Sequence, residues 1–204
     1  MKKKIIQAAD PVEIRLNKFI ANAGICSRRD ADQLILSGKI TVNDQVVQVL
    51  GTKIMPTDKI TYLKKIIQSE KLQYVLLNKP KDFITTTQDP QNRRTVMTLI
   101  EKACTERIYP VGRLDRHTTG LLLFTNDGDL AKRLTHPKYK IKKIYQLELD
   151  KPIIEAHYNE IVAGINLEDG LVSVDHLAIL TEDRKNLGIE IHIGKNRIVR
   201  RIFE

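Results

Sequence analysis

Tryptophan is absent from this 204-residue chain, and aromatic residues make up only 5% of it. A nucleic-acid surface built from many stacked rings is therefore not expected. The two cysteines, Cys26 and Cys104, lie far apart and form no CxxC motif, which excludes a disulfide scaffold and a structural zinc cluster. Such cysteine usage fits a reducing compartment, and we expect a cytoplasmic protein.

The sequence also lacks the motifs of several large enzyme classes. It contains no GxGxxG, GxxxxGK[ST] or GxSxG, so dinucleotide binding, P-loop chemistry and nucleophile-elbow hydrolysis have no support. The histidines have no metal-ligand spacing, and the HxE…PCxxC signature of zinc deaminases is missing. No run reaches the roughly 18 apolar residues of a membrane span, and the basic opening MKKKIIQAAD precedes no apolar core of signal-peptide length. We therefore expect chemistry without metal or cofactor, from carboxylate, Tyr, Lys and Arg side chains.

Positive charge is what the sequence has in excess. Lys and Arg total 34 against 25 Asp and Glu, which gives a net charge of +9 and a pI near 9.5. A surplus of this size indicates a polyanionic partner. The first 70 residues are more basic per residue than the remainder, and the polar stretch KKIIQSEK separates the two parts. We predict two domains, residues 12–65 and 71–204.

The first domain is predicted to contain two helices followed by a β-hairpin. An apolar pattern starting at Ile14 indicates a helix that ends near Gly24. Ser27, with Asp30 three residues later, begins a second helix that Gly38 ends. Two β-rich runs flank Asn43-Asp44, a two-residue hairpin signal, and residues 60–63 form a further strand.

Arg28 and Arg29 lie in the first turn of the predicted second helix. Backbone N–H groups are unpaired there and the helix dipole is positive, so cations fit poorly unless an external anion is present. A phosphate group would supply that anion. The alternative is a solvated helix end whose two arginines bind nothing.

The second domain mixes strands and helices with several strand–turn–strand links. This pattern predicts an α+β fold with a mostly antiparallel sheet and flanking helices, and a doubly wound parallel sheet is the weaker alternative. We expect buried strands at 74–78 and 121–125, a β-rich run at 83–87, further strands at 144–150, 171–180 and 188–193, and helices at 95–103, 129–134 and 153–164.

Asp115 stands in a loop between Gly112 and Gly120, with Arg113 and Arg116 on either side. A nearby guanidinium favours an ionised carboxylate and orients it, as an Asp nucleophile or base requires. The alternative is a surface loop that only forms salt bridges.

Two stretches resemble known families. LNKFIANAGICSRRDADQLILSGKITVND resembles the small RNA-binding module shared by a ribosomal small-subunit protein, tyrosyl-tRNA synthetases and many rRNA-modifying enzymes. GRLDRHTTGLLLFTNDG resembles the catalytic signature of the RsuA and RluB type of pseudouridine synthases, which modify ribosomal RNA and commonly carry that module at the N-terminus. The resemblance extends from about Ile14 to Glu204.

The resemblance implies a role for several residues. Asp115 matches the essential aspartate, Tyr145 the tyrosine that packs against the uracil, and Arg200 the basic residue that pairs with the aspartate. Arg197 and Arg201 are weaker candidates for that pairing, and the family commonly has glutamine where this chain has Ile198. Arg113 matches an arginine that fills the space left by the flipped-out target nucleotide. The candidate RNA-binding residues are Arg113, Arg28, Arg29, Arg116, Lys142 and Arg197.

The function implied is isomerisation of uridine to pseudouridine in ribosomal RNA, without metal or cofactor. Similarity of the Asp115 loop and of the stretch THPKYKIKKIYQL favours large-subunit (23S) rRNA as the target, and small-subunit rRNA and tRNA are the alternatives. The partner would be rRNA or a ribosomal precursor particle, and the protein a monomer with no membrane association. Family members generally continue for some tens of residues beyond Glu204, so a truncated C-terminus is expected. One alternative is a non-catalytic RNA-binding or ribosome-assembly factor. Another is a DNA-binding protein, but the sequence has no apolar dimerisation stripe and this function would leave Asp115 unexplained.

Overall fold

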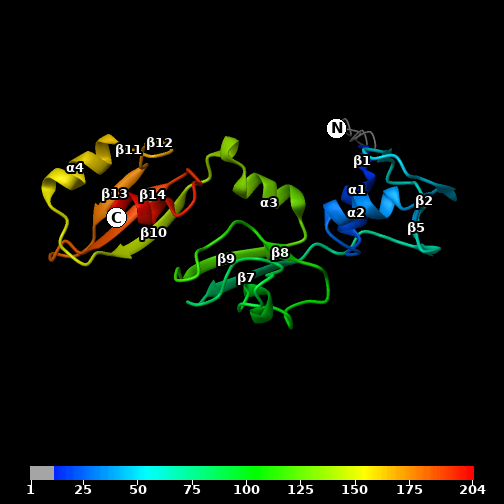
Figure 1. Ribbon diagram of the computed structural model, residues 1–204, viewed down its shortest axis with the longest axis horizontal. Helices are drawn as coiled ribbons and strands as arrows, with labels where there is room; N and C mark the ends of the chain where they lie inside the picture. Colours follow the sequence, from blue (N-terminus) through cyan, green and yellow to red (C-terminus); the bar gives the residue numbers. More distant parts are fainter. Residues whose placement is uncertain (1–11) are drawn as a thin grey trace, which may run out of the picture. The chain divides into compact units, whose positions relative to one another are not determined.

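The computed structural model describes residues 12–204 (Figure 1), and the basic opening run considered above lies outside this range. The described residues form two compact units. The first holds residues up to Leu77 together with Met97–Tyr109 and Leu123–Asp127, and the second holds Asn78–Val96, Pro110–Leu122 and Gly128–Glu204. The chain passes between them within strands β7 (Tyr74–Lys79) and β9 (Gly120–Thr125). Because these units interleave along the chain, the division into domains 12–65 and 71–204 stays a prediction.

In the first unit, helices α1 (Leu16–Asn22) and α2 (Arg28–Leu36) pack against each other. Strand β1 (Ile14–Arg15) pairs with β4 (Lys53–Ile54), and an antiparallel sheet in the order β3-β2-β5-β6 is formed by β2 (Ile40–Val42), β3 (Gln45–Val46), β5 (Ile60–Tyr62) and β6 (Lys65–Ile66). A single apolar cluster fills the interior of these elements: Leu16, Ile20, Ala31, Ile35, Ile40, Ile54 and Ile60.

The local signals of this part of the chain are confirmed. The Ser27 hydroxyl accepts a hydrogen bond from the Asp30 backbone N–H at 3.2 Å and so caps α2. Asn43 and Asp44 both have positive φ, 50° and 68°, as a type I′ hairpin turn requires. The first helix begins at Leu16 rather than Ile14, because Ile14 pairs with Ile54 in the β1–β4 ladder.

Strands β7, β9 and β8 (Tyr109–Pro110) form a sheet in the order β7-β9-β8. The predicted strands at 74–78 and 121–125 are thus present, but β7 is not buried: its residues alternate between more and less exposed. Two other predictions are wrong. The run 83–87 forms only an isolated bridge from Ile84 to Thr95, and residues 95–103 form only a short 3-10 turn, η1 (Val96–Leu99).

The second unit contains a three-stranded antiparallel sheet in the order β10-β14-β13, with a separate β11–β12 hairpin (Figure 1). Helices α4 and α5 bury their apolar side chains in the core of this sheet, where Ile161, Ile198 and Ile202 join Leu187 and Ile189. The bounds are α3 (Gly128–Thr135), η2 (Pro137–Tyr139), β10 (Lys143–Glu148), α4 (Glu155–Ala163), β11 (Ile165–Leu167), β12 (Gly170–Val172), β13 (His176–Ile179), β14 (Asn186–Ile191) and α5 (Ile198–Phe203).

Helix α4 begins two residues later than predicted. Ile153 is buried in the core, and its backbone N–H donates to the carbonyl of Arg184 while its carbonyl accepts from the Arg184 guanidinium. These bonds hold Ile153 outside the helix. Gly164 ends α4 with a φ of +103°, as predicted.

The predicted α+β fold with mostly antiparallel pairing is confirmed. The strand registers of β1–β6 and of β10–β14 are antiparallel, whereas the bridge between Ile84 and Thr95 is parallel. In the part of the chain that the structure describes, no helix combines the length and the apolar character needed to cross a bilayer.

Candidate functional site

Asp115 lies in the loop that joins β8 to β9. Gly112 and Gly120 frame this loop with φ values of +78° and +127°, which side chains with a Cβ rarely adopt. The Asp115 side chain is 41% exposed, so a ligand can reach the carboxylate. The sequence-based placement of Asp115 in a Gly-framed loop is therefore confirmed.

A buried lysine holds the backbone of the Asp115 loop through hydrogen bonds to its carbonyl oxygens. Lys79, at the end of β7, has no exposed surface. Its ammonium group donates to the carbonyl oxygens of Asp115 at 3.1 Å, Arg116 at 3.2 Å and Thr118 at 2.8 Å, and also contacts the Pro80 carbonyl. Burial lowers the pKa of Lys79, and the Asp115 and Asp82 carboxylates oppose that change.

Residues that follow Lys79 in the sequence also form hydrogen bonds to the backbone of this loop. The Thr85 hydroxyl donates to the Leu114 carbonyl at 2.8 Å and accepts from the Leu114 N–H at 3.2 Å. The Asp82 N–H donates to the Arg116 carbonyl at 2.9 Å. Asp115 therefore sits between two anchored neighbours, and its backbone position is determined before any ligand binds.

A guanidinium does face Asp115, but it comes from a distant part of the sequence. Nε of Arg200, on α5, lies 3.9 Å from an Asp115 carboxylate oxygen. Arg116 instead pairs with Asp82 at 3.3 Å, so the expectation that it flanks the Asp115 carboxylate is wrong. Arg197 and Arg201 pair with Glu204 and Asp169. Of Arg197, Arg200 and Arg201, the structure brings Arg200 within ion-pair distance of Asp115.

Tyr145 lies in the middle of β10, opposite Ile189 of β14. Its ring packs against the apolar core of the second unit. Burial raises the pKa of Tyr145, and the negative charge of Asp115 raises it further. Asp115, Arg200 and Tyr145 thus belong to one electrostatic cluster, and the phenol holds its proton at neutral pH.

The remaining candidates for RNA contact lie on the surface in different settings. Arg28 and Arg29 are exposed in the first turn of α2, and the Arg28 guanidinium donates to the Asn17 amide oxygen at 3.4 Å. Arg113 is exposed. Lys142 pairs with Glu190 at 2.6 Å, so its charge, like that of Arg197, is already balanced by a carboxylate.

The sequence reasoning missed the residues that support the site, above all Lys79 and Thr85. The signal available for Lys79 was its position at the end of an apolar strand, directly before Pro80. Lysine is almost never fully buried, so its role depends on carbonyl oxygens that a linear pattern does not bring together.

Within residues 12–204, no group of three or more His, Cys, Asp or Glu side chains is arranged to hold a metal ion. The groups that the site does present are a carboxylate, a guanidinium and a protonated phenol. This set can assist cleavage at a sugar carbon and hold a planar base against an aromatic ring.

Comparison with known proteins places this chain in a family. The family model described as RNA pseudouridylate synthase matches residues 73–204, and the S4 domain model matches residues 14–60. The chain belongs to the RNA pseudouridine synthase family. It is 42% identical over 194 residues to ribosomal large subunit pseudouridine synthase B of Bacillus subtilis, covering 93% of this chain and 79% of the relative. It is 40% identical to an uncharacterized RNA pseudouridine synthase of Aquifex aeolicus, covering 94% and 78%.

A solved pseudouridylate synthase shares the fold of this RNA pseudouridine synthase. The two match with a TM-score of 0.61 and 28% sequence identity, over 93% of this chain and 82% of the other. The resemblance found in residues 112–128 is thereby confirmed, as is the S4-type module that precedes it. Of the functions considered from the sequence, membership of this family selects the enzyme over the non-catalytic RNA-binding factor and the DNA-binding protein.

Proposed function

We propose that this pseudouridine synthase isomerises a uridine of large-subunit (23S) ribosomal RNA. Relatives from Bacillus subtilis, Buchnera aphidicola (34% identical) and Xylella fastidiosa (33% identical) carry the name ribosomal large subunit pseudouridine synthase B. The observation that carries the catalytic part of the proposal is the cluster of Asp115, Arg200 and Tyr145 within one unit.

In the proposed reaction the bond between N1 and C1′ of the target uridine breaks and a bond between C5 and C1′ forms. The carboxylate of Asp115 assists the cleavage at C1′, and Arg200 orients it through their 3.9 Å ion pair. The ring of Tyr145 packs against the detached uracil. Its phenol is protonated, so it relays the C5 proton by passing its own proton to solvent as it accepts the one from C5, while N1 gains a proton from solvent. Atoms and electrons balance within the nucleoside, so the proposal needs no cofactor or metal.

The target base must leave its stack before it reaches Asp115, at a cost of a few kcal/mol. Phosphate contacts offset that cost. We assign them to Arg28 and Arg29 in the domain at 12–65. In the domain at 71–204 we assign them to Arg116, Lys142 and Arg197, where a phosphate takes the place of the carboxylate with which each now pairs. Arg113 fills the space that the flipped nucleotide leaves. The protein acts as a monomer in the cytoplasm, where rRNA or a ribosomal precursor particle is its partner.

The direct test is to map pseudouridines in total RNA from a strain that lacks the gene, and to add purified protein to unmodified transcripts of 23S and 16S rRNA. The proposal predicts loss of a pseudouridine from 23S rRNA in the strain and its restoration by the protein in the 23S transcript. Modification of 16S rRNA or tRNA alone would contradict the proposed substrate.

A further inference from the structure

A concave site separate from the Asp115 cluster lies in the second unit, beside the end of the β10–β14 pair. The cavity has a volume of about 410 Å³, within the range of small-molecule and cofactor sites. One wall comes from the residues between α3 and β10, and the other from those after β14. Lys143 at the start of β10 pairs with Ile191 at the end of β14, so the cavity opens where the two strands diverge. Asp115, Tyr145 and Arg200 do not line it.

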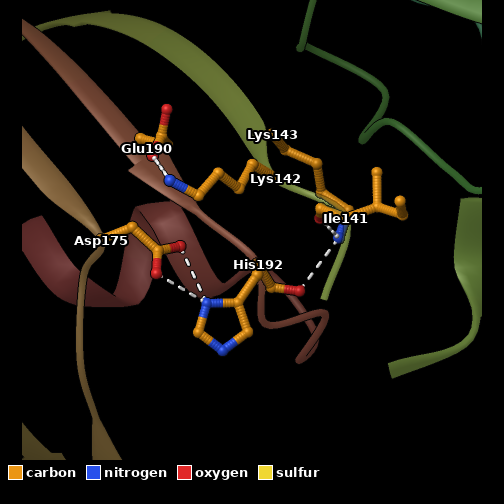
Figure 2. A network of polar contacts seen from close by, with 6 residues as sticks. All are labelled: Ile141, Lys142, Lys143, Asp175, Glu190 and His192. Carbon is orange, nitrogen blue, oxygen red and sulfur yellow. Dashed lines mark hydrogen bonds and ion pairs between the residues drawn. The ribbon is translucent and has the colours of Figure 1, made fainter. Parts of the chain in front are cut away.

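The cavity carries positive charge that its surroundings do not cancel. The Lys143 ammonium donates to the carbonyl oxygens of Ile141 at 3.2 Å and His192 at 3.1 Å, and so joins the two walls (Figure 2). Within residues 12–204, no carboxylate forms an ion pair with Lys143 or with Lys140, which also lines the cavity. Lys195 is balanced by Asp169 at 3.4 Å. Two uncompensated ammonium groups therefore favour an anionic ligand.

A histidine of fixed orientation completes the polar side of the cavity. Nδ1 of His192 lies 2.8 Å from both carboxylate oxygens of Asp175. A carboxylate only accepts hydrogen bonds, so Nδ1 carries a proton and the ring orientation is set. The second ring nitrogen points away from Asp175 (Figure 2) and is left for another partner.

Four apolar side chains line the cavity as well, Leu134, Pro137, Ile141 and Ile193, next to the polar Thr135 and His136. An inorganic anion would gain no binding free energy from these apolar side chains, whereas the base and sugar of a nucleotide would bury apolar area against them. The combination of a cationic side and an apolar side matches a nucleotide.

The cavity lies next to the catalytic cluster along β10. Lys143 and Tyr145 are two residues apart on this strand, so they face the same side and are separated by about 6.6 Å along it. The segment after β14 lines the cavity through Lys195 and then enters α5, which carries Arg200.

We propose that this cavity binds the nucleotide adjoining the target uridine in the RNA strand, with its phosphate held by Lys140 and Lys143 and with the second ring nitrogen of His192 accepting a hydrogen bond from its sugar or base. The assignment of the adjoining nucleotide rests on the proposed function. The cavity itself is tested by RNA binding alone.

The charge is tested with Lys140→Gln in the full chain, with Lys138→Gln as the matched control. Both lysines are exposed in the same turn, but Lys138 does not line the cavity. Binding of a 23S rRNA transcript is measured over a series of KCl concentrations. Lys140→Gln is expected to weaken binding several-fold and to reduce the slope of log affinity against log salt by about 0.7 to 0.9, while Lys138→Gln leaves the slope unchanged.

The volume is tested with Gly194→Leu, with Gly194→Ala as its control. A Cβ at Gly194 meets no heavy atom within 4 Å, and the residue has no positive φ. The fold should therefore tolerate leucine, which an unchanged urea-unfolding midpoint verifies, and because Gly194 lines the cavity the added side chain narrows its entrance. We expect several-fold weaker RNA binding for Gly194→Leu and near wild-type binding for Gly194→Ala.

The proposal is overturned if Lys140→Gln and Gly194→Leu bind RNA like their controls. It is also overturned if inorganic phosphate stabilises wild type but not Lys140→Gln against thermal unfolding while RNA binding is unaffected, because the cavity then holds free phosphate. Pseudouridine formation by wild type on the same transcript is scored separately. If wild type forms no pseudouridine on this transcript while the variants still bind RNA more weakly, 23S rRNA is not the substrate but the cavity remains an RNA-binding site.

Discussion

At the scale of single residues, Asp115 depends on a lysine that no ligand can touch. The three N–H groups of the Lys79 ammonium are shared among four carbonyl oxygens, three of them in the Asp115 loop. A buried ammonium is tolerated because these oxygens replace water. The position of the carboxylate is thus determined by a side chain from the neighbouring strand.

Replacing Lys79 by Met should destabilise the protein by about 1 to 3 kcal/mol, since buried carbonyl oxygens lose their donor. The isomerisation rate should fall as well, because the loop no longer holds Asp115, while RNA affinity stays near wild type. Urea unfolding and single-turnover isomerisation measure the two effects. Lys81→Met is the control, because Lys81 is exposed two residues away. An unchanged unfolding midpoint in Lys79→Met would show that the anchor carries no stability.

Tyr145 offers a titration that reports on Asp115. Burial and the Asp115 charge both favour the neutral phenol, so the pKa of Tyr145 lies above the ordinary value of about 10. The phenol keeps its proton through the neutral range and loses it only at alkaline pH above that value. Asp115→Asn removes one of the two causes and should lower the pKa of Tyr145 towards the ordinary value, which burial prevents it from reaching.

The measurement is the tyrosinate absorbance difference between wild type and Tyr145→Phe, repeated with Asp115→Asn and the double variant. The chain has 6 tyrosines, and the subtraction isolates the titration of Tyr145 from that of the others. The same midpoint in both backgrounds would mean that Asp115 and Tyr145 do not interact.

These residues differ in how far the sequence could predict them. Asp115 was found from its motif, and Arg200 was preferred over Arg197 and Arg201 by resemblance alone. Arg116 was wrongly placed beside the carboxylate, because sequence adjacency in a turning loop does not fix where a long side chain points. Lys79 was missed, because its partners come together only when β7 lies beside the loop.

At the scale of elements, local capping and turn chemistry determine the S4-type part of the chain. Both hydrogen bonds of the Ser27–Asp30 pair are formed, from the Asp30 N–H to the Ser27 hydroxyl and from that hydroxyl to the Asp30 carboxylate at 2.7 Å. They fix the start of α2, where Arg28 and Arg29 project.

Ser27→Ala should therefore destabilise the protein by about 1 kcal/mol, the usual cost of losing an N-cap. The comparison is Ser37→Ala, at the opposite end of α2, where the hydroxyl donates to the Leu34 carbonyl. The unfolding temperatures of Ser27→Ala, Ser37→Ala and wild type measure how much stability each hydroxyl contributes. Equal unfolding temperatures for Ser27→Ala and wild type would contradict the capping role.

Elements with strong local signals were predicted well, and those without them were not. The hairpin at Asn43-Asp44 carries its own turn geometry. The residues at 95–103 have helical spacing, yet only Val96–Leu99 form a 3-10 turn. The backbone there forms bonds three residues apart, from the Ile100 N–H to the Met97 carbonyl and from the Ala103 N–H to the Ile100 carbonyl, so the weak helical pattern does not produce an α-helix.

At the scale of the whole molecule, the net charge of +9 is consistent with a polyanionic substrate. Each Lys or Arg that neutralises a phosphate adds a salt-dependent contribution to affinity. The proposed contacts of Arg28 and Arg29 can therefore be counted in a binding experiment on the full chain.

Arg28→Gln combined with Arg29→Gln should weaken binding to a 23S rRNA transcript and reduce the salt slope by about 1.4 to 1.8, if each residue contacts one phosphate. Lys102→Gln combined with Lys151→Gln changes the charge equally at two exposed sites outside the proposed contacts. Filter binding over a series of KCl concentrations measures both. Equal salt slopes for the two double variants would show that RNA binding depends only on the net charge of the protein and not on phosphate contacts of Arg28 and Arg29.

The central claim is that the Asp115 carboxylate carries out the isomerisation, and single-turnover release of tritium from a 23S rRNA transcript labelled at uridine C5 tests it most directly. Asp115→Asn keeps the size of the side chain and removes its charge, and Asp150→Asn does the same at an exposed acid outside the cluster. The account predicts no detectable release by Asp115→Asn with RNA affinity within a few-fold of wild type, and normal release by Asp150→Asn. Substantial turnover by Asp115→Asn would contradict it.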